Sequence, residues 1–90
     1  MSDQHFELHL CRFDERRNMA GFYSLALQPS LFNEISVVRT WGRIGTRGRS
    51  RVDLFLNEHS AITHFLALAK WKRGRGYRPM HPARQPLPLG

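Results

Sequence analysis

Alternating apolar and polar residues in the first third of the chain predict two strands joined as a hairpin. Residues 5–13 and 19–28 both place apolar side chains at every second position, which is the pattern of half-buried strands. The charged residues 14–18 between them suit the turn. The inner face predicted for the two strands consists of Phe6, Leu8, Leu10, Tyr23, Leu25 and Leu27.

Two further strands are predicted in the middle of the chain. Residues 35–44 are rich in β-branched side chains, and residues 45–48 supply two glycines for a turn. Residues 49–56 again alternate, and we expect their inner face to be Val52, Leu54 and Leu56.

One amphipathic helix is predicted over residues 58–73. Asn57 is a suitable N-cap and Gly74 a suitable C-terminal stop. Its buried face is expected to contain Ile62, Phe65, Leu66 and Ala69, which have helical spacing.

These elements predict an α+β domain over residues 1–77, in which a small antiparallel β-sheet of about four strands is packed by one C-terminal amphipathic helix. Residues 78–90 contain four prolines and are expected to form a mobile tail. Pro79-Met80-His81-Pro82 fits a P-x-x-P pattern there, but such patterns are common in tails.

Charge is distributed unevenly along the chain. The net charge is +7, and residues 35–90 carry eleven Lys or Arg against two acidic residues, whereas residues 1–34 carry three Arg against five acids. A surface of this kind suits nucleic acids, anionic membranes or acidic proteins. The alternative is a generally basic protein that its charge keeps soluble.

Several other classes of protein are disfavoured. Ninety residues leave little room for a deep catalytic cavity. The single cysteine, Cys11, excludes an intramolecular disulfide, and the first residues lack the pattern of a signal peptide. No apolar run approaches the roughly 20 residues of a membrane span. We therefore expect a cytoplasmic protein with no membrane association.

The segment 39–51 contains five arginines and one tryptophan but no acid. On a strand, Arg39, Trp41 and Arg43 share one face. An indole can stack on a base or sugar, and guanidinium groups bond phosphates in bidentate fashion. The alternative is a core tryptophan flanked by arginines that extend along it to solvent.

A second basic cluster, residues 70–78, is interleaved with aromatic residues. Its cations can neutralise phosphates, or they can simply compensate the dipole at the end of the helix. From both segments, the predicted nucleic-acid-binding residues are Arg39, Trp41, Arg43, Arg47, Arg49, Arg51, Lys70, Lys72, Arg73 and Arg75.

The sequence offers little for other chemistry. His5 and His9 share a strand face but would lie about 13 Å apart, and His59 and His64 are five residues apart on the helix. Cys11 lacks the third group that a nucleophile needs, and the carboxylates are scattered. We expect no metal, no cofactor, no catalytic residue and no small-molecule substrate.

The stretch Trp41-Gly42-Arg43-Ile44-Gly45 resembles the motif of the WGR domain, found in DNA-dependent poly(ADP-ribose) polymerases and in short bacterial proteins. The resemblance covers about residues 5–77 and includes Gly48, Ala61 and Phe65 on the helix, and the ending Lys72…Gly76-Tyr77. It implies a compact antiparallel sheet with one helix, in which Gly42, Gly45, Gly48 and Tyr77 are structural positions.

In the polymerases, the tryptophan of the motif packs against the terminal nucleotide at a DNA break, and its arginine contacts DNA and a neighbouring domain. The resemblance implies these roles for Trp41 and Arg43. No catalytic, helical regulatory or zinc-finger domain is present in the sequence, so ADP-ribosylation is not expected.

We therefore expect a stand-alone, bacterial-type WGR protein that binds DNA at ends, nicks or distorted sites. One alternative is a protein–protein adaptor that docks onto a repair or regulatory enzyme. RNA is a further possible ligand, because charge and aromatic content do not distinguish it from DNA.

Overall fold

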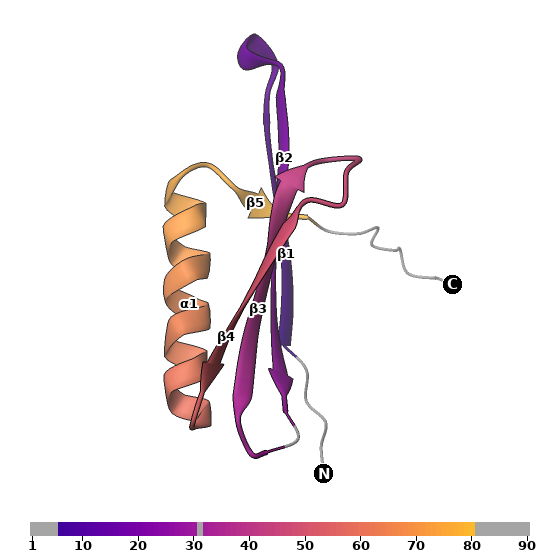
Figure 1. Cartoon of the computed structure of the whole chain (residues 1–90). Coiled ribbons are helices and arrows are strands. Elements are labelled where there is room, and N and C mark those ends of the chain that lie inside the picture. Colours follow the sequence, from indigo (N-terminus) through magenta and orange to yellow (C-terminus); the bar gives the residue numbers. More distant parts are fainter. Residues whose placement is uncertain (1–5, 31, 81–90) are drawn as a thin grey trace, which may run out of the picture.

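The computed structural model describes residues 6–30 and 32–80, which form one five-stranded antiparallel sheet with an α-helix against one of its faces (Figure 1). The order across the sheet is β4-β3-β2-β1-β5. The predicted α+β arrangement with one helix in the C-terminal half is confirmed. The strands are β1 (Phe6–Asp14), β2 (Met19–Pro29), β3 (Ile35–Arg43), β4 (Arg49–Phe55) and β5 (Arg78–Pro79), and the helix is α1 (Glu58–Gly74).

The short strand β5 was not predicted. It pairs with β1 at Leu10 and Cys11, and the amide of Met80 donates a hydrogen bond of 2.7 Å to the carbonyl oxygen of His9. The sheet therefore extends two residues past the predicted domain boundary at Tyr77. The rest of the predicted tail, from residue 81 on, lies outside the described residues.

The core lies between the helix and one face of the sheet. β2 contributes the three residues that alternation predicted, and all are at most 6% exposed. Leu10 and Val37 from the neighbouring strands are fully buried. The helix contributes the remaining buried residues of the core. The buried members of the core are Leu10, Tyr23, Leu25, Leu27, Val37, Ala61, Phe65 and Ala69.

The face predicted for β4 is wrong. Val52 and Leu54 are 55% and 59% exposed, and Leu56, just after the strand, is 81% exposed. The register with β3 places Asp53 opposite Val37 instead, so the odd-numbered residues face the helix. A carboxylate is tolerated there because three cationic or ionisable groups surround it. These are Arg51 at 3.2 Å, His64 at 3.4 Å and Arg39 at 3.8 Å.

The start of α1 follows the prediction, whereas its buried face is slightly rotated. The side chain of Asn57 accepts a hydrogen bond of 2.8 Å from the amide of Ser60, as an N-cap does. Of the four residues predicted to be buried, Leu66 is 58% exposed, so this part of the prediction is wrong. Ala61 takes its place in the core because the helix presents positions 61, 65 and 69 to the sheet.

The end of α1 depends on Gly76 and not on Gly74. Gly74 is the last helical residue, but Gly76 has the positive φ, at 98°. Its amide donates to the carbonyl of Arg73, and the amide of Tyr77 donates to that of Lys72. This closing turn directs the chain into β5.

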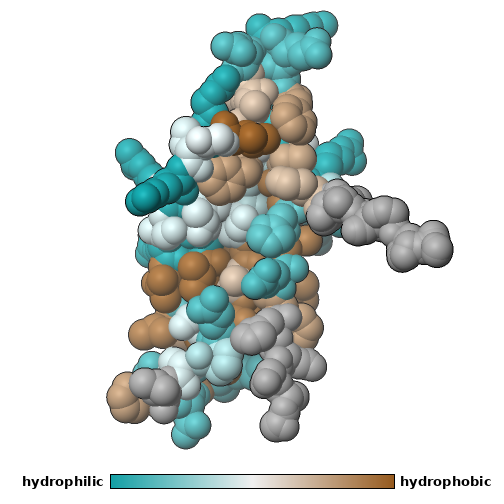
Figure 2. Space-filling model, turned by 90° about the vertical axis from the view of Figure 1, so that its right-hand side faces the viewer, coloured by the Kyte–Doolittle hydropathy of each residue, from teal (hydrophilic) through white to brown (hydrophobic). Residues whose placement is uncertain are grey.

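The other face of the sheet is not covered by the helix. Viewed from that side, apolar side chains gather over the middle of the sheet, and the tip of the β1–β2 hairpin is hydrophilic (Figure 2). Exposed Phe13, Val52 and Leu54 are on this face by strand alternation. In the part of the chain that the structure describes, no helix has the length and apolar content to span a bilayer.

Candidate nucleic-acid interface

Trp41 lies on the sheet face that packs against the helix, near the C-terminal end of β3. It lies opposite Tyr23 of β2 and Arg49 of β4 in the register of the sheet. The indole is half-buried and packs against the hydrophobic core. A portion of the ring therefore supports the core, and a portion remains accessible to a ligand.

The accessible part of Trp41 separates two hollows. The first, the α1–β3 cleft, has a volume of about 190 Å³ and is lined by Tyr23, Arg39, Trp41, Trp71 and Lys72. The second, the motif hollow, has a volume of about 280 Å³ and is lined by Met19, Ala20, Gly21, Trp41, Gly42, Arg43 and Tyr77. A ligand that reaches Trp41 from either side meets a cation.

Arg39 is more enclosed than the sequence suggested. It shares the inner face with Trp41 and Arg43, as predicted, but its side chain is only 20% exposed. The guanidinium lies 3.8 Å from Asp53 and 6.0 Å from the centre of the Trp41 ring. Its Nε is buried and has no hydrogen-bond partner among the described residues. Arg39 is thus a guanidinium held inside the cleft, and not a free surface group.

Arg43 is exposed and is held in place by the β1–β2 turn. One of its terminal nitrogens donates a hydrogen bond of 3.1 Å to the carbonyl oxygen of Asn18. Asn18 itself has a left-handed backbone, with φ at 52°. A guanidinium carries five N–H donors, so this single bond orients Arg43 and leaves donors for a phosphate.

The loop after the motif folds back onto β3. A Cβ on Gly42 would lie 2.7 Å from the α-carbon of Gly48, so the two backbones approach too closely for any side chain. Gly48 has a φ of 75°, and the hydroxyl of Thr46 donates to the carbonyl of Arg43 at 2.8 Å. The backbone that approaches Gly42 closely therefore belongs to the same chain. This arrangement also leaves Arg47 exposed on the loop.

Lys72 lies inside a ring of aromatic side chains. Its Nζ is 4.7 Å from the ring centre of Tyr23, 4.9 Å from that of Trp71 and 5.0 Å from that of Tyr77. Burial lowers the pKa of Lys72, and the nearby positive charges of Arg75, Arg39 and Arg12 lower it further. The cations at the helix end are therefore not all solvated, because Lys72 points toward the sheet.

The fold gathers some of the predicted residues and separates others. Arg39, Trp41, Arg43 and Lys72 meet around the two hollows. The remaining predicted cations are exposed but line neither hollow. They are Arg47 and Arg49 beyond the motif, Arg51 beside Asp53, and Lys70, Arg73 and Arg75 around the helix end.

A model of the WGR domain family matches residues 6–84. The chain belongs to this family. WGR domains generally bind nucleic acids. This WGR domain is also similar to the uncharacterized protein y4dW of Sinorhizobium fredii, with 46% identity over 79 residues. The match covers 88% of this chain but 39% of y4dW, so the chain spans about two fifths of that relative.

Three residues of this WGR domain were missed as site residues. Trp71 and Tyr23 line the α1–β3 cleft, and Arg12 is close enough to Lys72 to affect its pKa. Trp71 was visible as an aromatic within the second basic cluster, but its position relative to Trp41 depends on how the helix packs. Arg12 lies in the part of the sequence with a negative charge balance, so charge counting concealed it.

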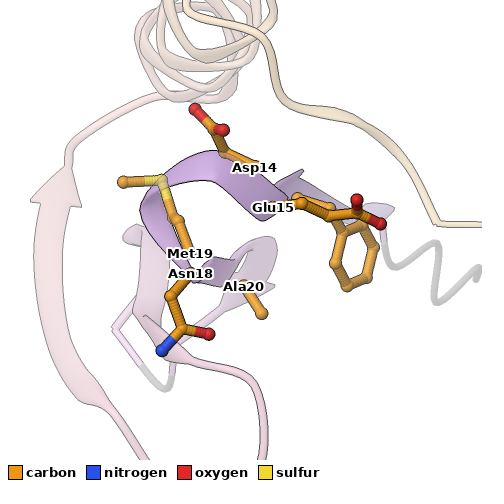
Figure 3. A pocket seen from close by; sticks show the side chains of 6 residues that line it. Asp14, Glu15, Asn18, Met19 and Ala20 are labelled. Atoms are coloured by element: carbon orange, nitrogen blue, oxygen red, sulfur yellow. The ribbon is translucent and has the colours of Figure 1, made fainter.

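The WGR domain has a third hollow, at the tip of the β1–β2 hairpin, which shares Met19 and Ala20 with the motif hollow (Figure 3). Of the two acidic residues that line it, Asp14 has local partners. Asp14 accepts a hydrogen bond from the amide of Arg16 and pairs with Arg17 at 3.7 Å, which caps the short 3-10 turn Glu15–Arg17. No group of three metal-ligating side chains occurs among the described residues.

Proposed function

We propose that this WGR domain binds DNA at ends, nicks or other distorted sites, and that Trp41 and Arg43 are the centre of the interface. The observation that carries the proposal is the position of Trp41, whose indole forms a wall of two hollows that each contain a cation. Intact duplex DNA stacks its bases internally. An indole in this position suits a nucleotide that has lost one stacking neighbour.

Phosphate contacts supply most of the affinity in this proposal. Arg43 is held by Asn18 at the edge of the motif hollow, and Arg47 extends from the loop beside it. Further exposed cations are available on β4 and around the helix end, namely Arg49, Arg51, Lys70, Arg73 and Arg75. Contacts of this kind are independent of base sequence, so we expect structure-selective and not sequence-selective binding.

The test is fluorescence anisotropy on duplexes of equal length that are blunt, nicked or closed by hairpins at both ends. We expect open or nicked DNA to bind more tightly than closed DNA. Trp41→Ala should remove this preference, at a cost of about 1–3 kcal/mol for one stacked nucleotide. Trp41→Phe should retain part of it, and Arg43→Ala should weaken binding to every DNA.

Phe13→Ala is the matched control for the aromatic change. Phe13 is 67% exposed and lies on the sheet face away from the helix, so its loss should leave DNA affinity unchanged. The proposal fails if all three DNAs bind equally and Trp41→Ala behaves like the wild type. Matched RNA duplexes in the same assay distinguish DNA binding from RNA binding.

A protein–protein adaptor is the second candidate function. The exposed apolar side chains on the uncovered sheet face favour it, because contiguous apolar surface commonly marks contact sites (Figure 2). This candidate requires a specific partner whose binding Trp41→Ala or a charged substitution at Val52 abolishes, together with weak DNA binding that neither change affects.

A further inference from the structure

The α1–β3 cleft has an aromatic residue on each of its two sides. Trp41 comes from the sheet, and Trp71, which is 53% exposed, comes from the last turn of the helix. The volume of about 190 Å³ is smaller than the roughly 300–1,000 Å³ of small-molecule pockets. The cleft therefore suits one planar ring system with a charged group at its mouth, and not a complete cofactor.

Two buried polar atoms of the cleft residues lack partners. The hydroxyl of Tyr23 and the Nε of Arg39 form no hydrogen bond with any described residue, although Tyr23 is only 2% exposed. An unpaired buried donor destabilises a protein, and such groups commonly mark a site that a ligand or water completes. Both residues line the same hollow, so two polar groups without a partner lie in its wall.

The charge of the cleft selects the kind of ligand. Lys72 and Arg39 line it, and the positive charges of Arg75 and Arg12 act on the same ammonium group. Among the described residues, no carboxylate pairs with Lys72. Arg39 is paired with Asp53 at 3.8 Å, so the uncompensated charge in the cleft is that of Lys72. A cationic ligand is disfavoured here, whereas an anion would relieve the repulsion that acts on Lys72.

Given the DNA-binding function proposed above, we infer that the α1–β3 cleft takes one extrahelical nucleobase of a DNA strand, between Trp41 and Trp71, with the adjoining phosphate on Lys72 and Arg39. The preferred substrate is then DNA with an unpaired nucleotide, and Trp71 is a specificity-determining residue. A base that enters stacks on the indoles and displaces the Lys72 ammonium, which lies 4.9 Å from the centre of the Trp71 ring, toward the phosphate that every nucleotide carries.

The experiment compares two hairpin duplexes whose ends are closed by non-nucleotide linkers, so that neither has a free end or unpaired loop bases. They differ by one extrahelical thymidine in the stem. By anisotropy, the wild type should bind the bulged hairpin roughly 5- to 100-fold more tightly than the paired one. Trp71→Ala should abolish this preference and leave affinity for the paired hairpin within about twofold. Leu66→Ala is the control, since Leu66 is an exposed residue of the same helix outside the cleft.

A second pair of variants separates the cleft from general electrostatics. Lys72→Gln and Lys70→Gln remove the same charge two residues apart, but only Lys72 lines the cleft. The first should reduce the preference for the bulged hairpin at least several-fold more than the second. With 5-fluorotryptophan incorporated, the ¹⁹F resonance of Trp71 should shift on addition of the bulged hairpin and remain unchanged with the paired one.

Failure of this assignment is distinguishable from failure of the proposed function. If both hairpins bind equally well to the wild type, or if Trp71→Ala weakens both by the same factor, the cleft does not select an unpaired base, although the domain still binds DNA. If neither hairpin nor blunt and nicked duplexes bind at low salt, the DNA-binding function itself is wrong, and the assignment of the cleft falls with it.

Discussion

Gly48 packs against the backbone carbonyl of Trp41, so closely that a Cβ on Gly48 would overlap the carbonyl oxygen. The same Cβ would lie 2.8 Å from the ring of Phe22, on the uncovered side of the sheet. The loop after the motif is therefore locked onto β3 by contacts that exist only because residue 48 has no side chain. The position of Trp41 and the direction of Arg47 depend on this contact.

Substitution of Gly48 should be much more disruptive than substitution of Gly45. Both glycines have positive φ, at 75° and 99°, but a Cβ on Gly45 meets nothing within 4 Å. Gly45→Ala should lower the free energy of unfolding by about 1–2 kcal/mol through backbone strain alone. Gly48→Ala adds the steric overlap and should lower it further, as urea unfolding would measure. Equal losses in the two variants would contradict this packing.

Asp53 should stabilise the fold although it is a carboxylate on the inner face. Its contacts with Arg39, Arg51 and His64 connect β3, β4 and α1. Asp53→Asn should lower the free energy of unfolding by about 1–3 kcal/mol, since hydrogen bonds to charged groups are among the stronger ones. Glu7→Gln is the control, because Glu7 and its partner His9 are both exposed and such pairs contribute little. A loss no larger than that of the control would show that the cluster is dispensable.

The stability of the protein should respond to pH through Lys72. Burial and neighbouring cations lower the pKa of Lys72, so the native protein releases this proton at a lower pH than the unfolded chain does. Between the lowered pKa and the ordinary value, the unfolded state binds more protons, and stability through this group rises with pH.

Urea unfolding at pH 7 and just below the ordinary lysine pKa of about 10.4 would measure this. The change in the free energy of unfolding between the two pH values should be more favourable in the wild type than in Lys72→Gln. Lys70→Gln, which removes an exposed lysine, should match the wild type. If the unfolding free energies of Lys72→Gln and Lys70→Gln change equally with pH, the pKa of Lys72 is not lowered in the folded protein.

DNA affinity should fall with added salt. If about five phosphates are neutralised, log K should decrease with log[salt] at a slope of roughly −4 to −5. Arg43→Ala should reduce the magnitude of this slope by about one, whereas Phe13→Ala should leave it unchanged. Titrations at several salt concentrations on one nicked duplex provide the measurement. A slope near zero would exclude an interface built on phosphate contacts.

The sequence predicted β2 correctly and β4 incorrectly for a physical reason. In β2 only one face is apolar enough to be buried, so alternation alone identifies Tyr23, Leu25 and Leu27. In β4 the apolar residues Val52 and Leu54 alternate just as regularly, but pairing with β3 turns them outward. The deciding partners of Asp53 come from other elements, and no local pattern reveals them.

In the candidate site, too, local sequence patterns predicted some features and missed others. Spacing along β3 was sufficient to place Trp41 and Arg43 on one face, and the turn glycines were recognisable from their neighbours. Lys72 was predicted only as one of the cations at the helix end. The contribution of Trp71 and Tyr23 could not be predicted, because it arises where the helix end packs beside β3. Long-range packing of this kind creates the cleft, and the sequence shows only its separate parts.

The most direct test of the central claim is a map of where nicked duplex DNA contacts the folded protein. In a ¹H–¹⁵N correlation spectrum, the indole resonance of Trp41 and the amides of residues 42–48 should shift or broaden most. Amides of β4 around Val52 and Leu54 should change little. If instead the uncovered sheet face around Val52 responds and Trp41 does not, the interface lies elsewhere and the proposed role of the motif is wrong.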